Sequence, residues 1–283
     1  MLLNAVIFIL RETLEAALVI SVLLAIAAQF KKNMRWLIAG ISAGVFGAYL
    51  YAANMKQLSA WFDYSGQEVV NAALHGSIVV LITVHVAALV TLLLRDGTDE
   101  AGLAAGYGYH PIFWASAASI VSLAVVREGS EIFLYLGRFD PQSPEGLAVV
   151  LGSGIGFGIG LSTGIILYYG LLGLSRRSKL AVSVTLLALF AGNMAAQLSL
   201  QLTQADWIPH TQALWDSSRF VSEHSVLGHI LYAMFGYEAT PSFIQVMSYL
   251  SGVVVVATSI CLSWFFNGRA DSCADGRADS GYN

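Results

Sequence analysis

Residues 2–26 read LLNAVIFILRETLEAALVISVLLAI, an apolar stretch interrupted by the charged side chains of Arg11, Glu12 and Glu15. About 20 helical residues cross the hydrocarbon core of a bilayer, so the stretch predicts a membrane-spanning helix. A charged side chain at the centre of such a helix costs about 2.5–3.5 kcal/mol on insertion scales. The three charges are therefore candidates for function.

A second apolar stretch, residues 112–137, carries the same R-E-x-x-E motif. In each motif the two Glu side chains lie three residues apart on one helix face, and the Arg lies four residues before the second Glu. Four carboxylates against two guanidinium groups leave a formal charge of −2, which suits a multivalent cation that prefers hard oxygen ligands. We predict that the metal ligands are Glu12, Glu15, Glu128 and Glu131, with Arg11 and Arg127 orienting the carboxylates. The alternative is that each motif is an Arg–Glu ion pair that locks helices together.

The composition predicts a membrane protein along the whole chain. It is 57% hydrophobic and 11% charged, with a mean hydropathy of +0.68, whereas soluble domains carry about 25% charged residues. No basic tract is present for nucleic acid. We predict an all-α integral membrane protein with seven transmembrane helices, at residues 2–29, 36–54, 69–94, 112–137, 147–173, 180–203 and 243–266.

The two motifs divide the chain into halves. Each motif opens a set of three spans, at residues 1–95 and 112–203, and an odd number of spans per half predicts an inverted repeat. Both motifs lie roughly 10 residues, or about 15 Å, from the same end of the bundle. We therefore predict one permease domain, residues 1–266, that works by alternating access, with the span at 243–266 added to the repeat.

The basic residues between spans predict the orientation, because they concentrate on the cytoplasmic side of membrane proteins. They place the amino terminus outside and predict a cytoplasmic tail, residues 267–283, too polar to pack and so disordered. Short loops and the absence of a glycosylation sequon fit the plasma membrane of a bacterium, its inner membrane. Nine basic residues lie on the predicted inner side: Lys31, Lys32, Arg35, Arg95, Arg176, Arg177, Lys179, Arg269 and Arg277, against Lys56, Arg138 and Arg219 outside.

Other polar residues within or next to spans are weaker metal-site candidates. His75 and His85 are ten residues apart, about 80° from a common helix face, so they do not form a two-His site by themselves. Asn193 and Gln197 begin a polar stripe that either lines the path or holds helices together. Glu68 lies at the start of the third span. The loop at 203–242 predicts a partly ordered cap.

Small residues recur at helical spacing in the second and fifth spans. Such residues let helix backbones approach closely in membranes, so we predict a packing role. They are Gly40 and Gly44, and Gly152, Gly156, Gly160 and Gly164.

On these motifs the chain resembles the oxidase-dependent iron permeases, which include the fungal high-affinity iron permease and the bacterial Efe-system permease. The segments 214–218 and 235–242 also look like that family's loop before the last span. The resemblance implies uptake of ferric iron, which a partner oxidase makes from ferrous iron, with the Glu residues of both motifs binding the ion. The family's Gln-Glu-x-x-Glu pattern reads Gln67-Glu68-x-x-Asn71 here, which weakens an accessory site at Glu68.

We therefore expect an iron permease and not an enzyme, because no zinc-protease, nucleophile-elbow or Walker motif is present. Iron would be the transported substrate, with no cofactor bound permanently. Expected partners are a ferroxidase or periplasmic oxidase and the lipid bilayer, and the sequence leaves open a homo-oligomer. The alternatives are a transporter of ferrous iron, lead or manganese, and a metal-sensing receptor.

Overall fold

The computed structural model describes residues 1–283 except 31–33, 96–110, 223–224 and 279–283. In these described parts the regular secondary structure is helical, apart from one isolated β-bridge between Ala213 and Ser242. Seven of the described helices are long and apolar enough to cross a membrane, which confirms the predicted spans to within four residues. They are α1 (Leu2–Ala27), α2 (Arg35–Ala53), α4 (Gly66–Arg95), α6 (Pro111–Leu136), α7 (Pro144–Leu172), α8 (Arg176–Gln204) and α10 (Phe243–Ala278).

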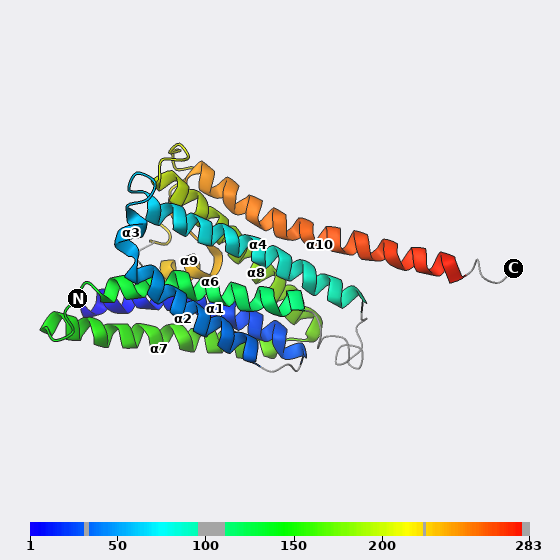
Figure 1. The fold of residues 1–283 in the computed structure, drawn as a ribbon, viewed down its shortest axis with the longest axis horizontal. Helices are drawn as coiled ribbons and strands as arrows, with labels where there is room; N and C mark the ends of the chain where they lie inside the picture. The colour runs from blue at the N-terminus through cyan, green and yellow to red at the C-terminus, as the bar shows by residue number, and fades with distance from the viewer. Residues whose placement is uncertain (31–33, 96–110, 223–224, 279–283) are drawn as a thin grey trace.

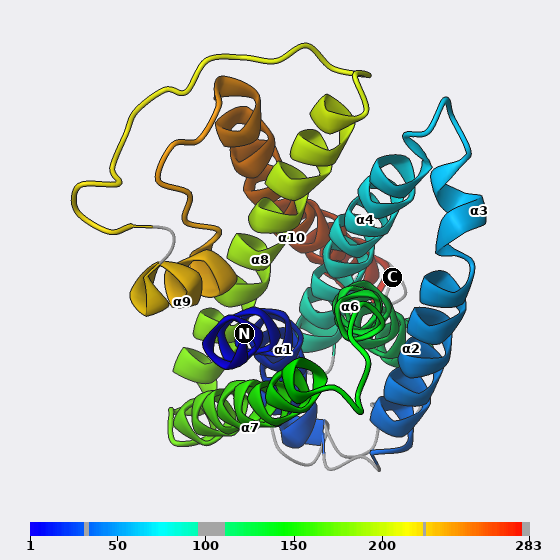
Figure 2. The same ribbon diagram turned by 90° about the vertical axis from the view of Figure 1, so that its left-hand side faces the viewer.

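The spans lie side by side and form a single bundle (Figure 1). Viewed from the end at which α1 begins, α1 and α6 lie in the middle, α7 and α8 flank α1, and α2 packs on α6 (Figure 2). We call this end, which also holds the short helix α3 (Met55–Ser59), the amino-terminal face. A 3-10 turn, η1 (Ala28–Phe30), follows α1, and the short helix α9 (Val226–Phe235) precedes α10.

Glycines set the two tightest helix pairs, as the spacing predicts. A Cβ added at Gly156 of α7 would lie 2.5 Å from the carbonyl oxygen of Val6 on α1. A Cβ at Gly44 of α2 would lie 2.6 Å from the Cβ of Val125 on α6. Because no side chain fits at these places, the glycines fix how α7 covers α1 and how α2 covers α6.

Serine caps begin two of the spans. Ser143 accepts a hydrogen bond from the backbone N–H of Gly146 and is followed by Pro144, which suits the first turn of α7. Ser175 caps α8 through the N–H of Ser178. The chain therefore reverses sharply before α7 and again before α8.

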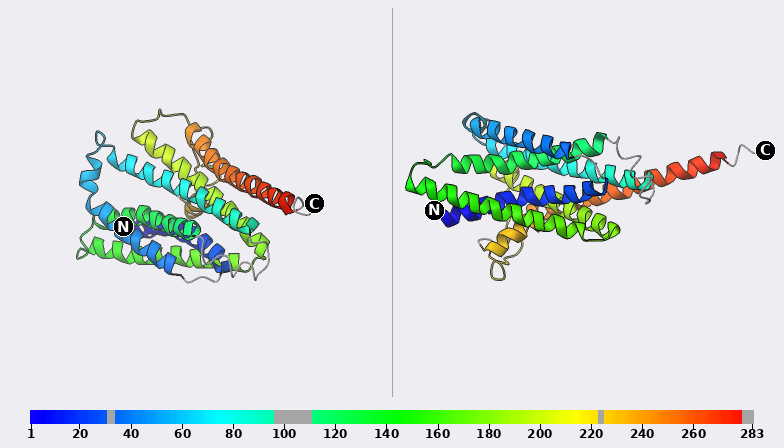
Figure 3. Two further views of the ribbon diagram at one scale, coloured as in Figure 1. Left: turned by 45° about the vertical axis from the view of Figure 1, so that its right-hand side comes forward. Right: turned by 90° about the horizontal axis from the view of Figure 1, so that it is seen from below.

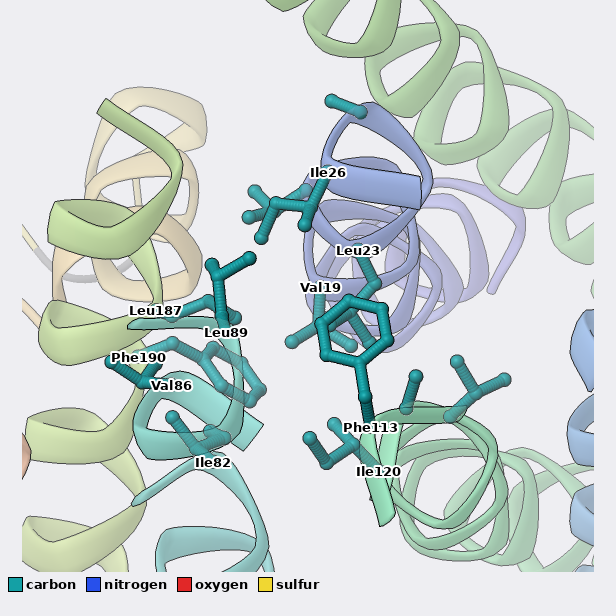
Figure 4. Close-up of a cluster of buried hydrophobic side chains, with 14 of the residues drawn as sticks. Val19, Leu23, Ile26, Ile82, Val86, Leu89, Phe113, Ile120, Leu187 and Phe190 are labelled. Carbon is teal, nitrogen blue, oxygen red and sulfur yellow. The ribbon is translucent and has the colours of Figure 1, made fainter. Parts of the chain in front are cut away.

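The half of the bundle away from the amino-terminal face has an apolar core. Side chains of four helices meet there, including Ile78 of α4 and Ala124 of α6. Figure 4 labels ten others of this group: Val19, Leu23 and Ile26 of α1, Ile82, Val86 and Leu89 of α4, Phe113 and Ile120 of α6, and Leu187 and Phe190 of α8. We call this group the apolar core. It fills the space between the four helices on that side.

The last helix differs from the prediction. We expected disorder over 267–283, but the backbone of α10 is helical as far as Ala278 and extends beyond the other spans (Figure 3). Extending an existing helix needs no new nucleus, so a polar segment joined to a spanning helix can remain helical. Residues 279–283 lie outside the described residues.

Candidate metal-ion site

The first motif lies on the buried side of α1. Glu15 is 0% exposed and Glu12 is 1% exposed. The Nε atom of Arg11 lies 3.5 Å from a carboxylate oxygen of Glu15 and 4.0 Å from one of Glu12. The predicted brace between an Arg and the Glu four residues later is therefore present in this motif.

The second motif is braced differently. Arg127, only 5% exposed, donates a hydrogen bond of 2.8 Å to Glu15 of α1 and another to its neighbour Glu128. The structure gives no ion pair between Arg127 and Glu131, the partner expected from helical spacing. The guanidinium instead bridges the two motifs, because α1 and α6 pack against each other at this level.

The carboxylates of the two motifs converge around this bridge. The carboxylates of Glu12 and Glu128 lie close to each other, and that of Glu131 is near enough for its charge to act on Glu12. One oxygen each of Glu12, Glu15 and Glu128 is buried without a hydrogen-bond partner. Buried carboxylate oxygens normally have partners. The Glu15 oxygen lies 3.5 Å from Arg11 in an ion pair, whereas those of Glu12 and Glu128 have no close partner and could bind a cation.

Glu131 lies one helical turn nearer the amino-terminal face than Arg127, and its side chain is half-buried. It lines a polar cavity of about 310 Å³ together with Glu68, Asn71 and other side chains of α1, α4, α6 and α8. Glu68 also borders an outer cavity of about 490 Å³, which Asp63 and Asp206 line as well. The structure thus brings the weaker candidate Glu68 next to Glu131.

On the opposite side the carboxylates border apolar side chains, and a cavity of about 740 Å³ with a mainly apolar lining reaches Glu128. Val19 follows Glu15 by one turn on α1, and Ala124 precedes Glu128 by one turn on α6, and both belong to the apolar core. The polar cavity that contains Glu131 therefore lies on the side of the carboxylates toward the amino-terminal face.

The remaining weaker candidates are buried but differ in their partners. His85 lies within the apolar core, where its Nδ1 atom is 3.0 Å from the hydroxyl of Ser116 and its ring stacks on Phe113. His75 has no hydrogen-bond partner on either ring nitrogen. Asn193 and Gln197 are buried in α8, and Gln201, one turn further, lines the 310 Å³ cavity.

The described part of the loop 203–242 is ordered by hydrogen bonds, as a partly ordered cap requires. Backbone N–H groups of Leu214 and Ser217 donate to carbonyls of Pro241 and Ala239. The hydroxyl and backbone N–H of Ser218 donate to Asp216 and hold the pKa of that carboxyl below its usual range. Asp216 therefore stays ionised at the surface.

The sequence did not predict a contact that this loop makes with the first motif. The ring of Tyr232, on α9, lies 4.2 Å from the guanidinium carbon of Arg11, a cation–π contact. Gly236 ends α9 with φ +68°, next to the side chain of Asn193. Nothing in the local sequence around Tyr232 signals a contact with α1.

Within the described residues, no group of three or more His, Cys, Asp or Glu side chains is arranged to hold a metal ion as it stands. Arg127 lies between Glu15 and Glu128, where its charge offsets theirs. A cation that replaced this guanidinium would meet carboxylates from two helices. A metal ion could therefore take the place of the Arg127 guanidinium between the carboxylates.

Comparison with known proteins gives a consistent result. The sequence profile of the Iron permease FTR1 family matches residues 2–267. The chain is 30% identical over 257 residues to the ferrous iron permease EfeU of Yersinia pestis, which covers 84% of this chain and 86% of that relative. It is 28% identical over 253 residues to EfeU of Escherichia coli O6:H1, with 84% and 87% covered. No solved structure matches the chain.

Proposed function

The chain belongs to the Iron permease FTR1 family, and from this membership we propose that iron crosses the membrane through the Glu side chains of its two R-E-x-x-E motifs. Permeases are transporters and not enzymes. The observation that carries the proposal is the Arg127 bridge, which joins Glu15 and Glu128 while buried carboxylate oxygens of both motifs have no hydrogen-bond partner. A purely structural ion pair would leave fewer oxygens unpaired.

In the proposed mechanism, iron enters the polar cavity from the amino-terminal face and meets Glu131 first. The ion then moves one turn deeper to Glu12, Glu15 and Glu128, and Arg127 moves away from the space between the carboxylates. The apolar core blocks further movement until the helices rearrange. This order corresponds to alternating access, with the described conformation open toward the amino-terminal face.

The helix pairs support the proposed inverted repeat. If α1, α2 and α4 correspond to α6, α7 and α8, the contact of α1 with α7 corresponds to that of α6 with α2. The contact of α4 with α6 likewise corresponds to that of α8 with α1, and all four pairs are in contact. The Gly-mediated approach occurs in both members of the first correspondence.

We propose ferric iron as the cargo, because carboxylates are hard oxygen ligands and the resemblance implies a partner oxidase. Ferrous iron is the second candidate, favoured by the names of the relatives, which are ferrous iron permeases. The formal charge of −2 on the two motifs would be neutralised by a divalent ion. Lead or manganese would meet the same ligands.

The proposed setting is a bacterial inner membrane, with the amino-terminal face outside and the end of α10 in the cytoplasm. Iron would then reach the polar cavity from the periplasm, where an oxidase or iron-binding partner could deliver it. The long apolar helices and the bacterial relatives support this location.

The test is metal uptake by liposomes that contain only this protein. Ferrous iron with a reductant, ferric citrate and manganese are offered separately outside the vesicles, and internal metal is measured. We expect ferric iron to accumulate above the level in protein-free vesicles. Accumulation of ferrous iron instead would favour the second candidate. Binding without accumulation would contradict the proposal and favour a metal-sensing receptor.

A further inference from the structure

Two buried histidines on α4 have different surroundings. His85 and His75 are each 1% exposed. The Nδ1 atom of His85 pairs with Ser116 and its ring stacks on Phe113 within the apolar core, while its Nε2 atom has no hydrogen-bond partner. His75 has neither ring nitrogen in a hydrogen bond, although the backbone carbonyl of Asn71 lies close to the ring.

An unpaired polar ring at this depth needs an explanation, because burying a polar group without a partner costs roughly 1–3 kcal/mol on mutational scales. His75 does not serve the apolar core, which begins one turn deeper on α4 at Ile78. It also makes no hydrogen bond that would hold α4 to another helix. Apart from the nearby Asn71 carbonyl of its own helix, the described part of the structure offers no partner for the ring nitrogens.

The position of His75 follows the proposed path of the ion. On α4, Glu68, Asn71 and His75 are spaced at three and four residues, so they share one helix face. Glu68 and Asn71 line the 310 Å³ cavity beside Glu131, and His75 lies one turn deeper, about 6 Å along the helix.

On α6, which runs in the opposite direction to α4, a cavity-lining residue and a deeper residue are likewise separated by one helical turn. Arg127 lies one turn deeper than Glu131, at the level of the bridge to Glu15. The positive charge of Arg127 acts on the ring of His75, so the ring lies near this bridge. His75 therefore lies one turn deeper than the cavity-lining residues of α4 and within range of the charge of Arg127.

We propose that His75 is a ligand of the transported ion, binding it through an imidazole nitrogen as it passes from Glu131 to the buried carboxylates. This inference rests on the proposed function and adds a nitrogen donor to a set of oxygen donors. Because a neutral imidazole brings no charge, it leaves the formal balance of the motifs unchanged. It allows Arg127 to move away while the ion keeps a protein ligand.

The added nitrogen changes which ions the path accepts. Carboxylates alone suit magnesium, calcium and manganese, whereas imidazole suits iron, copper, nickel and zinc. A path with His75 therefore favours iron over manganese by more than the carboxylates would alone. His75 is in this sense a specificity-determining residue.

The test measures the ligands of iron directly. The purified full-length protein in detergent is loaded with ferrous iron under anaerobic reducing conditions, and X-ray absorption at the iron edge reports whether an imidazole is bound. Binding of ferrous iron and of manganese is measured in parallel. The variants are His75→Gln and the matched control His85→Gln, which changes an equally buried histidine on the same helix.

We expect an imidazole signal in the unaltered protein and in His85→Gln, and its loss in His75→Gln. Ferrous iron binding should weaken at least about tenfold in His75→Gln, because loss of even an outer partner of a metal ligand typically costs 10–100-fold. Manganese binding should weaken less. Should His75→Gln fail to fold, the spectrum of the unaltered protein decides alone.

Iron held only by oxygen ligands in the unaltered protein would overturn the inference, as would an unchanged imidazole signal and unchanged iron binding in a folded His75→Gln variant. These outcomes differ from failure of the proposed function. If the function fails, liposomes with the unaltered protein do not accumulate iron, and substitutions of Glu15 or Glu131 do not change uptake.

Discussion

Replacing Arg127 with Gln removes the guanidinium that bridges α1 and α6. Its partners Glu15 and Glu128 are buried, and Arg127 itself is 5% exposed. Removing one partner of a buried ion pair typically destabilises a protein by about 3–5 kcal/mol, because a buried charge is left uncompensated. We expect Arg127→Gln to lower the free energy of unfolding by an amount in this range.

At about 2–4 °C per kcal/mol for a protein of this size, the melting temperature in detergent should fall by roughly 6–20 °C. The matched control is Arg219→Gln, an exposed loop position, which should stay within about 0.5 kcal/mol. The double variant with Glu15→Gln should regain part of the loss, with a coupling energy of about 0.5–3 kcal/mol.

Thermal unfolding of these variants in one detergent, with the metal chelated, gives the double-mutant cycle. Adding ferrous iron should then raise the melting temperature of Arg127→Gln more than that of the unaltered protein, since the ion can take the place of the guanidinium. The view that Arg127 holds the two motifs together would be refuted if Arg127→Gln lowered the free energy of unfolding by less than about 1 kcal/mol. It would also be refuted if the effects of Arg127→Gln and Glu15→Gln were simply additive.

Two further substitutions test the packing around the site. Gly156→Leu should lower stability by about 1–3 kcal/mol, because its Cβ would lie 2.5 Å from the Val6 carbonyl oxygen, whereas Gly158→Leu, with nothing within 4 Å, should have little effect on the melting temperature. Equal losses in both would argue against the Gly-mediated approach. Tyr51→Phe removes a 2.9 Å hydrogen bond to Asn71 and should cost about 0.5–1.5 kcal/mol in the same assay; an unchanged melting temperature would contradict a stabilising role.

The spans were predictable from the sequence because hydropathy and length decide them almost alone. The seven apolar stretches correspond to the seven long helices. The spacing of the glycines in α7 correctly indicated the face that packs against α1. The helical conformation at the end of α10 was not predictable from composition. Composition describes how a segment behaves alone, and it does not include the effect of a spanning helix joined to that segment. Helix continuation to Ala278 follows from that attachment.

The sequence indicated which residues carry charge within the spans, but not how these residues pair. Spacing within one helix correctly indicated the contact of Arg11 with Glu15, but it also indicated a contact of Arg127 with Glu131. Arg127 instead reaches across to Glu15, and such a contact depends on how α1 and α6 are placed, which no local pattern contains. The contact of Tyr232 with Arg11 was missed for the same reason.

The most direct test of the account is iron uptake by liposomes that contain Glu15→Gln or Glu131→Gln, compared with Glu145→Gln, an exposed Glu in the first turn of α7. Correct insertion is verified for each protein. The account predicts that both motif variants lose most of their iron uptake while Glu145→Gln transports like the unaltered protein. Near-normal uptake by folded Glu15→Gln and Glu131→Gln variants would contradict it.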